Sequence, residues 1–151
     1  MNIEIDDLTR PEVRALLEEH LQDMRSLSPA ESVHALDIEK LRGPDISFWC
    51  AWDGPTLVGC GALRKLNGEH GEIKSMRSPN ALRRRGAGRA ILQHILATAK
   101  ERGLQRLSLE TGSGAAFHPA HSLYESAGFV RCGPFGEYAE DVNSVFMTLR
   151  I

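Results

Sequence analysis

The hydrophobic residues of the N-terminal third recur first with a period of two and then with the period of a helix. Residues 3–5 alternate apolar and polar side chains, which predicts a short strand. Apolar residues then recur at helical spacing over residues 11–24, and Pro11 stands where the first turn of a helix accepts a proline. A second helical pattern begins at Ser28, which offers a cap, and ends at Gly43. We therefore expect one strand followed by two consecutive helices.

The middle of the chain is dense in β-forming residues that are interrupted by turn residues. Residues 46–52 and 57–66 read as two strands joined by the turn Asp53-Gly54-Pro55. Asn67-Gly68 turns the chain again, toward a third strand over residues 72–76. We expect these strands to be antiparallel neighbours.

Helices and strands alternate in the C-terminal half of the sequence. The expected elements are a helix that ends near Arg102, a strand over 104–109, a short helix over 119–126, and strands over 129–132 and 142–151. A strand, a helix and a strand in this order form a crossover connection, so the strands over 72–76 and 104–109 should be parallel. The periodicity predicts a mixed α/β fold.

Length, composition and charge narrow the class of protein. The 151 residues are of single-domain size, and contents of 42% hydrophobic and 25% charged residues are ordinary for a globular protein. A net charge of −2 provides no general attraction to nucleic acids. The sequence shows no secretory signal peptide and no apolar run of membrane-spanning length, and its 3 cysteines lack metal-binding spacing. We expect one cytoplasmic domain over residues 1–151, with no nucleic-acid or membrane partner.

A basic, glycine-rich loop precedes the central helix. Arg83-Arg84-Arg85 is followed by Gly86-Ala87-Gly88 and then by the helical pattern. Backbone N–H groups and the positive end of the helix dipole bind anions at a helix start, and glycines let a phosphate approach the backbone closely. The spacing fits neither the dinucleotide fingerprint G-x-G-x-x-G nor the nucleoside-triphosphate loop G-x-x-x-x-G-K-[ST]. A solvated basic turn at a helix start is the alternative interpretation.

Two segments resemble those of a known family. Arg83-x-x-Gly86-x-Gly88, between a strand and a helix, resembles the pyrophosphate loop Q/R-x-x-G-x-G/A of the GNAT superfamily of acyl-CoA-dependent N-acyltransferases. Leu123-Tyr124-Glu125-Ser126-Ala127-Gly128-Phe129 resembles the helix-to-strand segment of that superfamily, and the expected order of elements matches its fold along the full length. The resemblance implies an α/β (or α+β) GNAT fold: a mixed, mostly antiparallel sheet of about seven strands with a central splayed parallel pair, and about four helices. It also implies an N-acetyltransferase that uses acetyl-CoA as its acyl donor.

The resemblance assigns residues to the coenzyme. In GNAT folds the acyl-CoA arm lies where the two parallel strands splay apart, because separating strands leave backbone groups without partners. Backbone groups of Met76 and Ser78 would contact the pantetheine and the acyl carbonyl. The pyrophosphate would contact Arg83, Arg84, Arg85, Gly86, Ala87, Gly88 and Arg89. Many relatives hold the pantetheine arm with an asparagine that is absent here, and Ser113, His118 or backbone groups are the candidates to replace it.

Two residues are expected to carry out the chemistry. A neutral amine must attack a thioester, so the site needs a base for the amine proton and an acid for the leaving thiolate. Glu72 stands eleven residues before Arg83, where the glutamate of the histone-type enzymes stands, and is the candidate base, acting through a water. Tyr124 is the candidate acid, because a phenol with a pKa near ~10 can protonate an alkyl thiolate. A salt-bridged or solvent-facing Glu72 and a core Tyr124 are the alternatives.

The acceptor site is expected beside the two early helices. In GNAT folds these helices cover the acyl end of the coenzyme, which places His20, Met24 and His34 near the acceptor. The expected acceptor is a small-molecule amine or an amino-acid-like compound. Acidic residues near the mouth favour a cationic amine, whereas Arg25 and Arg64 would suit a carboxylate, and both interpretations stay open.

Other interpretations of the sequence lead to different proteins. A non-catalytic acyl-CoA-binding module would bind the coenzyme and release no thiol. A nucleic-acid-binding domain would use the arginines of 83–85. His118-x-x-His121 could supply two metal ligands, with Glu110 as a third. Two histidines at this spacing are more often surface or polar-contact residues, so we expect no metal site. The apolar run over 145–147 allows a homodimer through terminal strands, as in many GNAT proteins.

Overall fold

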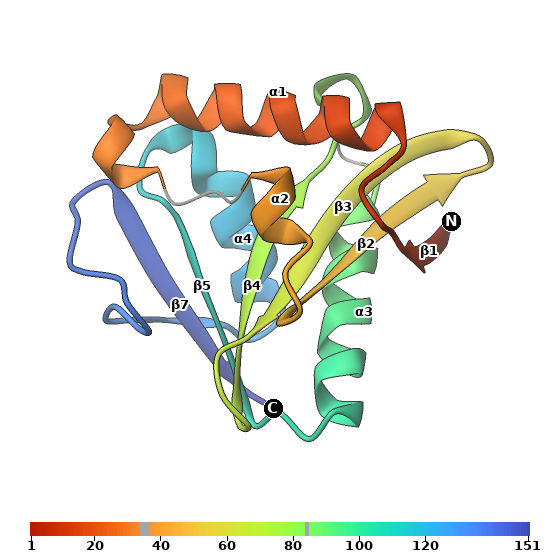
Figure 1. The fold of residues 1–151 in the computed structure, drawn as a ribbon. Coiled ribbons are helices and arrows are strands. Elements are labelled where there is room, and N and C mark those ends of the chain that lie inside the picture. Colours follow the sequence, from red (N-terminus) through yellow and green to blue (C-terminus); the bar gives the residue numbers. More distant parts are fainter. Residues whose placement is uncertain (34–36, 84) are drawn as a thin grey trace.

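The polypeptide forms one mixed sheet with helices on both faces (Figure 1). The computed structural model describes residues 1–33, 37–83 and 85–151. The strands are β1 (Asn2–Ile5), β2 (Ile46–Asp53), β3 (Thr56–Lys65), β4 (His70–Arg77), β5 (Arg106–Gly112), β6 (Val130–Cys132) and β7 (Ser144–Arg150). The α-helices are α1 (Pro11–Leu27), α2 (Ile38–Leu41), α3 (Ala87–Glu101) and α4 (His118–Ser126), and short 3-10 helices cover Ala30–Ser32, Asn80–Leu82 and Ala115–Phe117. None of the helices in these ranges is both long and apolar enough to cross a membrane.

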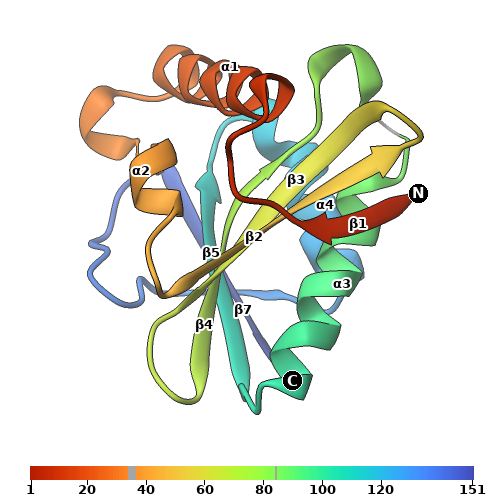
Figure 2. The same cartoon turned by 45° about the vertical axis from the view of Figure 1, so that its right-hand side comes forward.

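The predicted fold class and the predicted pairings of the central strands are confirmed. The strands lie in the order β1-β2-β3-β4-β5-β7-β6, and β4 and β5 form the parallel pair expected from the crossover. The expected antiparallel succession of β2, β3 and β4 is also present. Figure 2 shows β1 at the edge of the sheet beside β2, so that β4 and β5 lie in its middle.

The second predicted helix is wrong in its extent. The single helix expected over 28–43 is divided, because after the 3-10 helix Ala30–Ser32 the backbone of Val33 is extended (φ −90°, ψ 112°). The Asp37 carboxylate accepts a hydrogen bond from Lys40 N at 2.9 Å and caps a new, four-residue helix, α2. A local side-chain cap therefore restarts the helix within a stretch whose apolar spacing is continuous.

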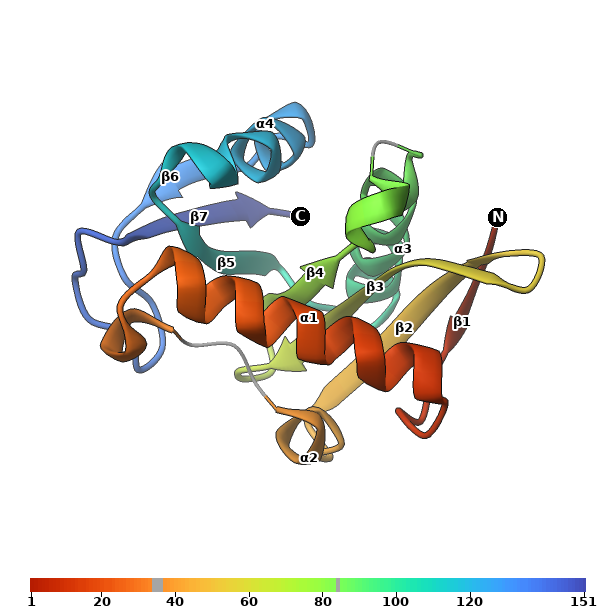
Figure 3. The ribbon, with the colours of Figure 1, turned by 90° about the horizontal axis from the view of Figure 1, so that it is seen from above.

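The two faces of the sheet hold two hydrophobic clusters. One packs α3 and α4 against the sheet and includes Ile91, Ile95 and Leu107. The other packs α1 and α2 against the opposite face and includes Phe48 and Cys60. Figure 3 shows the sheet between α1 and α2 on one side and α3 and α4 on the other. Because side chains alternate along a strand, each strand of the sheet contributes to both faces.

Strand β4 separates from β5 after a short parallel pairing. The register pairs residues 70–73 of β4 with residues 106–109 of β5. Beyond this pairing β4 contains a bulge, since its register with β3 shifts between Cys60 and Ala62 and Ser75 adopts φ 56°. A bulge bends the strand that carries the extra residue. The C-terminal ends of β4 and β5 therefore diverge, as Figures 1 and 3 show, and the splayed pair expected from the resemblance is present.

Two glycines of β3 let α3 approach the sheet closely. A Cβ at Gly59 would meet Ile91 Cδ1 at 3.0 Å. A Cβ at Gly61 would meet Met76 Sδ at 2.6 Å and Ile91 Cγ2 at 2.7 Å. Because Gly59 and Gly61 have no side chains, Ile91 packs directly on β3, and this close packing fixes the position of α3 on the sheet.

Gly61→Ala is expected to lower the free energy of unfolding by about 1–3 kcal/mol, because overpacking a full site forces its neighbours to move. Denaturant titration measures this change. Gly68→Ala is the matched control, since a Cβ at Gly68 meets no atom within 4 Å. Its unfolding free energy should stay within about 0.5 kcal/mol of the wild type. Equal stability of the Gly61→Ala protein and the wild type would contradict the close packing of α3.

Candidate active site

Polar side chains of β4 and β5 lie on the sheet face that α1 covers. Lys74 is the register partner of Ala62, which belongs to the hydrophobic cluster beneath α1, so Lys74 and Glu72 point to this face. Ser108, the register partner of Glu72 on β5, points the same way. Glu72 is 2% exposed. It lies one residue before Ile73, at which the pairing of β4 with β5 ends.

Two donors hold the Glu72 carboxylate. Lys74 Nζ donates to Glu72 Oε2 at 3.2 Å, and Tyr138 Oη donates to the same oxygen at 2.5 Å. Lys74 Nζ also donates to Tyr138 Oη at 2.8 Å. The side chains of Lys74 and Glu72 are 7% and 2% exposed, and buried charges of this kind are stable only when they are paired and hydrogen-bonded. The salt bridge that the sequence left as an alternative for Glu72 is therefore present.

Tyr138 reaches Glu72 from the segment between β6 and β7. Its ring packs against Phe135 and Phe146, with centroids 5.1 and 5.6 Å away. Burial, with the neighbouring Glu72 charge, raises the pKa of Tyr138 well above that of an ordinary phenol. Its hydroxyl therefore keeps its proton and acts as a donor.

A chain of hydrogen bonds crosses β4, β5 and β7 beside Glu72. His70 Nε2 is 2.7 Å from Ser108 Oγ, and Ser108 Oγ is 2.9 Å from Thr148 Oγ1. Thr148 Oγ1 donates to Leu107 O at 3.2 Å, so it accepts from Ser108, which in turn accepts from His70. Burial lowers the pKa of His70 and so favours the neutral ring, whose Nε2–H supplies the donor at the start of this chain. The Ser108 hydroxyl thus donates its proton to Thr148 and accepts from His70, so it joins β4 to β7 across β5.

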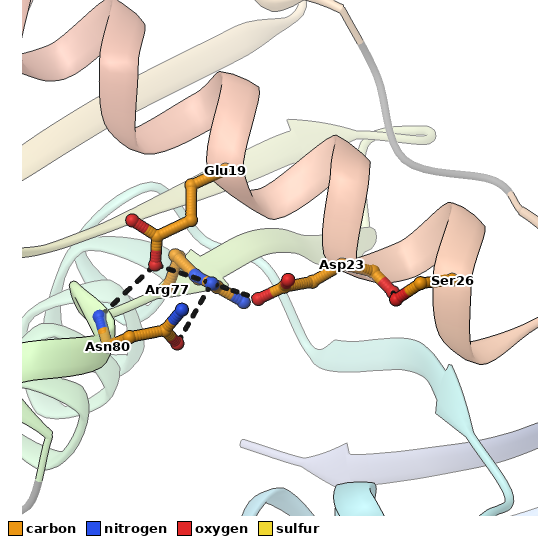
Figure 4. A network of polar contacts seen from close by, with 5 residues as sticks. All are labelled: Glu19, Asp23, Ser26, Arg77 and Asn80. Atoms are coloured by element: carbon orange, nitrogen blue, oxygen red, sulfur yellow. Dashed lines mark hydrogen bonds and ion pairs between the residues drawn. The ribbon is translucent and has the colours of Figure 1, made fainter.

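A network of charged side chains fixes α1 over the end of β4 (Figure 4). Arg77 of β4 donates to Glu19 Oε1 at 2.7 Å and to Asp23 Oδ2, and both carboxylates belong to α1. Asn80 Oδ1 accepts from the same guanidinium at 3.2 Å, and Asn80 N donates to Glu19 Oε1 at 3.1 Å. The Arg77 side chain is 5% exposed, and its hydrogen bond lowers the pKa of Asp23. The network holds α1 in place above the splayed end of β4.

The residues expected at the acceptor site belong to α1 and the chain after it. His20 is partly buried, and its Nδ1 is enclosed without a hydrogen-bond partner among the described residues. Burial, with a smaller contribution from Arg77, lowers the pKa of His20 to about 4, so its ring is neutral at pH 7. Met24 lies one turn further along α1 and is also partly buried. His34 lies outside the described residues.

Tyr124 lies on the opposite face of the sheet from Glu72. It belongs to α4, is 6% exposed, and packs edge-on against Phe129 with ring centroids 5.8 Å apart. It is part of the cluster that packs α3 and α4 on the sheet, and burial raises its pKa, so it is a neutral phenol at pH 7. In the described ranges no hydrogen bond joins Tyr124 to Glu72, and the two candidates approach the sheet from different sides.

The loop before α3 has the backbone geometry of an anion-binding helix start. Gly86 caps α3 in the left-handed region (φ 81°, ψ 4°), and no side chain occupies the cap position. The first N–H groups of a helix have no partner within the helix, so they are available to an anion here. Ala87 is buried, while a Cβ at Gly88 would contact Leu123 Cδ2 of α4 at 3.4 Å. This packing holds the helix start between the sheet and α4.

The arginines of the loop are directed to solvent. Arg83, Arg85 and Arg89 are exposed, and Arg89 Nη1 donates to Ser126 Oγ of α4 at 3.4 Å. Arg84 lies outside the described residues. Exposed guanidinium groups next to an uncapped helix start suit a phosphate, because they add charge and bidentate donors.

Of the two residues expected to contact the coenzyme through their backbone, Met76 lies in the bulge of β4 and Ser78 follows the end of the strand. The Met76 side chain is directed into the α3 cluster, against Gly61 and Ile91. Ser78 lies between the end of β4 and the 3-10 helix Asn80–Leu82 and is partly buried. The Met76 side chain is partly buried and packs against the α3 cluster, which leaves its backbone at the bulge as the group proposed to meet a ligand.

The segment after β5 uses its polar side chains for backbone contacts. Ser113 Oγ donates to Val142 O at 2.8 Å, which ties the segment to the start of β7. His121 Nε2 is 2.7 Å from Gly112 O, and His118 is exposed at the start of α4. Ser113 and His121 therefore brace the end of β5.

Sequence reasoning missed Lys74, Arg77 and Tyr138. The two-residue spacing of Glu72 and Lys74 predicts that they share one face of a strand, and that signal was available. Tyr138 is 66 residues from Glu72, and no local pattern relates the two positions.

Comparisons with known proteins agree on one family. The family model described as acetyltransferase (GNAT) family matches residues 13–129. The chain is 57% identical over 151 residues to YsnE of Bacillus subtilis (strain 168), named an uncharacterized N-acetyltransferase, and both chains are covered completely. It is 42% identical over 133 residues to the IAA acetyltransferase of Azospirillum brasilense, which covers 87% of this chain and 86% of that relative.

The fold is also similar to a solved structure with a bound ligand. That structure is a GNAT family acetyltransferase from Elizabethkingia anophelis with acetyl-CoA bound. The TM-score is 0.68 at 16% sequence identity, and the alignment covers 99% of this chain and 97% of the other. At this identity the likeness shows the fold.

Proposed function

Since the chain belongs to the acetyltransferase (GNAT) family, we propose that it transfers an acetyl group from acetyl-CoA to a primary amine. The observation that carries the proposal is the separation of β4 from β5 beyond residue 73, with the buried Glu72 at its start. Separating parallel strands leave backbone N–H and C=O groups that an extended amide chain can pair with. The pantetheine arm of coenzyme A is such a chain.

The coenzyme would lie along the separated end of β4. Backbone groups of Met76 and Ser78 would pair with the pantetheine amides and the acetyl carbonyl. The pyrophosphate would meet the helix start of α3, where Gly86 supplies a cap free of side-chain atoms and exposed arginines supply positive charge. The named pyrophosphate contacts are Arg83, Arg84, Arg85, Gly86, Ala87, Gly88 and Arg89.

The reaction would proceed by direct attack. The lone pair of the neutral amine forms a bond to the thioester carbon, and Glu72 takes the amine proton through a water. The C–S bond of the tetrahedral intermediate then breaks, and Tyr124 donates its proton to the departing thiolate. Two features support these roles: Glu72 lies at the start of the strand separation, and Tyr124 is buried and protonated on the other face. The acetyl carbon would sit between the two faces, where β4 and β5 part.

Tyr124→Phe is expected to lower kcat about 10²-fold, because the leaving thiolate loses its proton donor. The variant keeps the ring that packs on Phe129, so the affinity for acetyl-CoA should stay at the wild-type value. Steady-state kinetics and calorimetric titration measure the two quantities separately. Full activity of Tyr124→Phe would exclude Tyr124 as the acid.

The acceptor would enter on the face covered by α1, near His20, Met24 and His34. We propose a small-molecule amine or an amino-acid-like compound in the cytoplasm as the acceptor. The name of the Azospirillum brasilense relative, an IAA acetyltransferase, supports a small molecule over a protein lysine.

The experiment that tests this function is a screen of primary amines for acetyl-CoA-dependent release of free thiol. At least one amine should raise thiol release well above the rate without an acceptor, and the product should be its N-acetyl derivative by mass spectrometry. Coenzyme binding without thiol release for any amine would instead favour a non-catalytic acyl-CoA-binding module.

A further inference from the structure

Tyr138 and Lys74 both hydrogen-bond the Glu72 carboxylate, although Tyr138 lies 66 residues from Glu72 in the sequence. We propose that these two residues position the Glu72 carboxylate for catalysis, with Oε2 anchored and Oε1 left to accept the proton. This inference rests on the proposed function, in which Glu72 is the base.

The geometry of the three side chains carries the inference. Both donors, Lys74 Nζ at 3.2 Å and Tyr138 Oη at 2.5 Å, bind Oε2. Among the described residues, no other side chain donates a hydrogen bond to Glu72 Oε1. A carboxylate that is fixed through one oxygen has a defined rotamer, and its second oxygen keeps its lone pairs for a proton.

Tyr138 is itself rigidly held. Its ring lies 5.1 Å from Phe135 and 5.6 Å from Phe146, and the Lys74 ammonium lies 5.5 Å from the Tyr138 ring centroid. Lys74 Nζ also donates to Tyr138 Oη at 2.8 Å, so the two donors fix each other. The segment between β6 and β7 is thereby connected to the proposed base on β4.

Several charged groups face this cluster from the surrounding elements. Arg64 is the register partner of Glu72 on β3. The charge of Glu110 on β5 raises the pKa of Tyr138, and the charge of Arg64 lowers it. The charge of Glu72 acts to raise the pKa of His70 on β4, and the charge of Lys74 acts to lower the pKa of His20 on α1. Of all these groups, Tyr138 and Lys74 are the two that hydrogen-bond the carboxylate, so they are the ones that should control its protonation directly.

The test is the pH dependence of kcat/KM in Tyr138→Phe. The substitution removes the hydroxyl and keeps the ring packing. A donor that binds the ionised carboxylate opposes its protonation, so without that donor the acid limb of the profile should move to higher pH by about 1 unit. Thr9→Val is the matched control, because it removes a hydroxyl that donates to a different carboxylate, that of Asp7, and its acid limb should coincide with that of the wild type.

A second measurement follows the protonation of the Glu72 carboxylate directly, without enzymatic turnover. The side-chain carboxyl ¹³C signal of Glu72, identified by its absence in Glu72→Gln, is titrated by NMR in the wild type and in Tyr138→Phe. Its midpoint should move to higher pH by about the same amount as the acid limb. Lys74→Met removes the other donor and the positive charge, and it should move the midpoint in the same direction and further.

The outcomes separate this inference from the proposed function. An unmoved Glu72 signal in Tyr138→Phe, while Glu72→Gln is inactive, would overturn the inference and leave Glu72 as the base. A shifted Glu72 signal with an unmoved acid limb would show that Glu72 is not the base, and it would overturn the inference together with that part of the mechanism.

Discussion

Glu72→Gln is expected to lower kcat/KM about 10³-fold, within the range that general-base catalysis contributes. Glutamine has the same size, and its side-chain oxygen can still accept hydrogen bonds from Lys74 and Tyr138, so the buried group of three should stay assembled. The amide has no basic lone pair at neutral pH, so the proton of the attacking amine has no acceptor. The affinity for acetyl-CoA should stay within about 2-fold of the wild type, since the pyrophosphate site is on another segment.

Glu69→Gln is the matched control for this substitution. Glu69 is exposed in the turn before β4, and its contacts with Gln105 and Arg106 are made by its backbone oxygen. The same chemical change there should leave kcat/KM unchanged. Wild-type activity of the Glu72→Gln protein would remove Glu72 from the mechanism.

Gly86→Asp is expected to weaken acetyl-CoA binding about 10²-fold or more. An aspartate at the cap of α3 would accept the helix N–H groups that the pyrophosphate is proposed to use, and its charge would repel the phosphates. Loss of hydrogen bonds to a charged group of this kind is worth about 1.5–3 kcal/mol each, and 1.4 kcal/mol corresponds to a factor of ten. Calorimetric titration measures the dissociation constant.

Gly54→Asp is the matched control for Gly86→Asp. Gly54 also has a positive φ, 57° against 81° at Gly86, and a Cβ at either position meets no atom within 4 Å. The control therefore introduces the same backbone strain and the same charge in the turn between β2 and β3, away from α3. Equal coenzyme affinity in the two variants would contradict the assignment of the pyrophosphate to the start of α3.

The antiparallel succession of three central strands could be predicted because turn residues mark each change of direction in that part of the sequence. Asp53-Gly54-Pro55 and Asn67-Gly68 separate the antiparallel strands β2, β3 and β4, and Gly103 follows the end of α3. These are local signals in which each residue type has a conformational reason. The sequence could not predict which face of β4 carries Glu72, because a shift of one residue exchanges the two faces of a strand. The burial of Ala62 beneath α1 settles that side in the structure.

The site itself depends on contacts that are distant in sequence. Arg77 joins β4 to Glu19 and Asp23, 58 and 54 residues earlier in the chain, and no periodicity relates these positions. Tyr138 likewise belongs to a segment without regular structure, in which the sequence offered turn residues and no pattern of burial. The helix predicted after Ser28 failed for the opposite reason, since the local cap at Asp37 prevailed over a continuous apolar spacing.

The most direct measurement is calorimetric titration of the protein with acetyl-CoA, desulfo-CoA and ATP. Saturable binding of acetyl-CoA and desulfo-CoA is expected, with ATP at least about 10-fold weaker because it lacks the pantetheine arm that pairs with β4. That selectivity would place the coenzyme arm, as well as its phosphates, on the protein. No binding of acetyl-CoA, or equal binding of ATP, would contradict the central claim that β4, β5 and the loop before α3 form a site for coenzyme A.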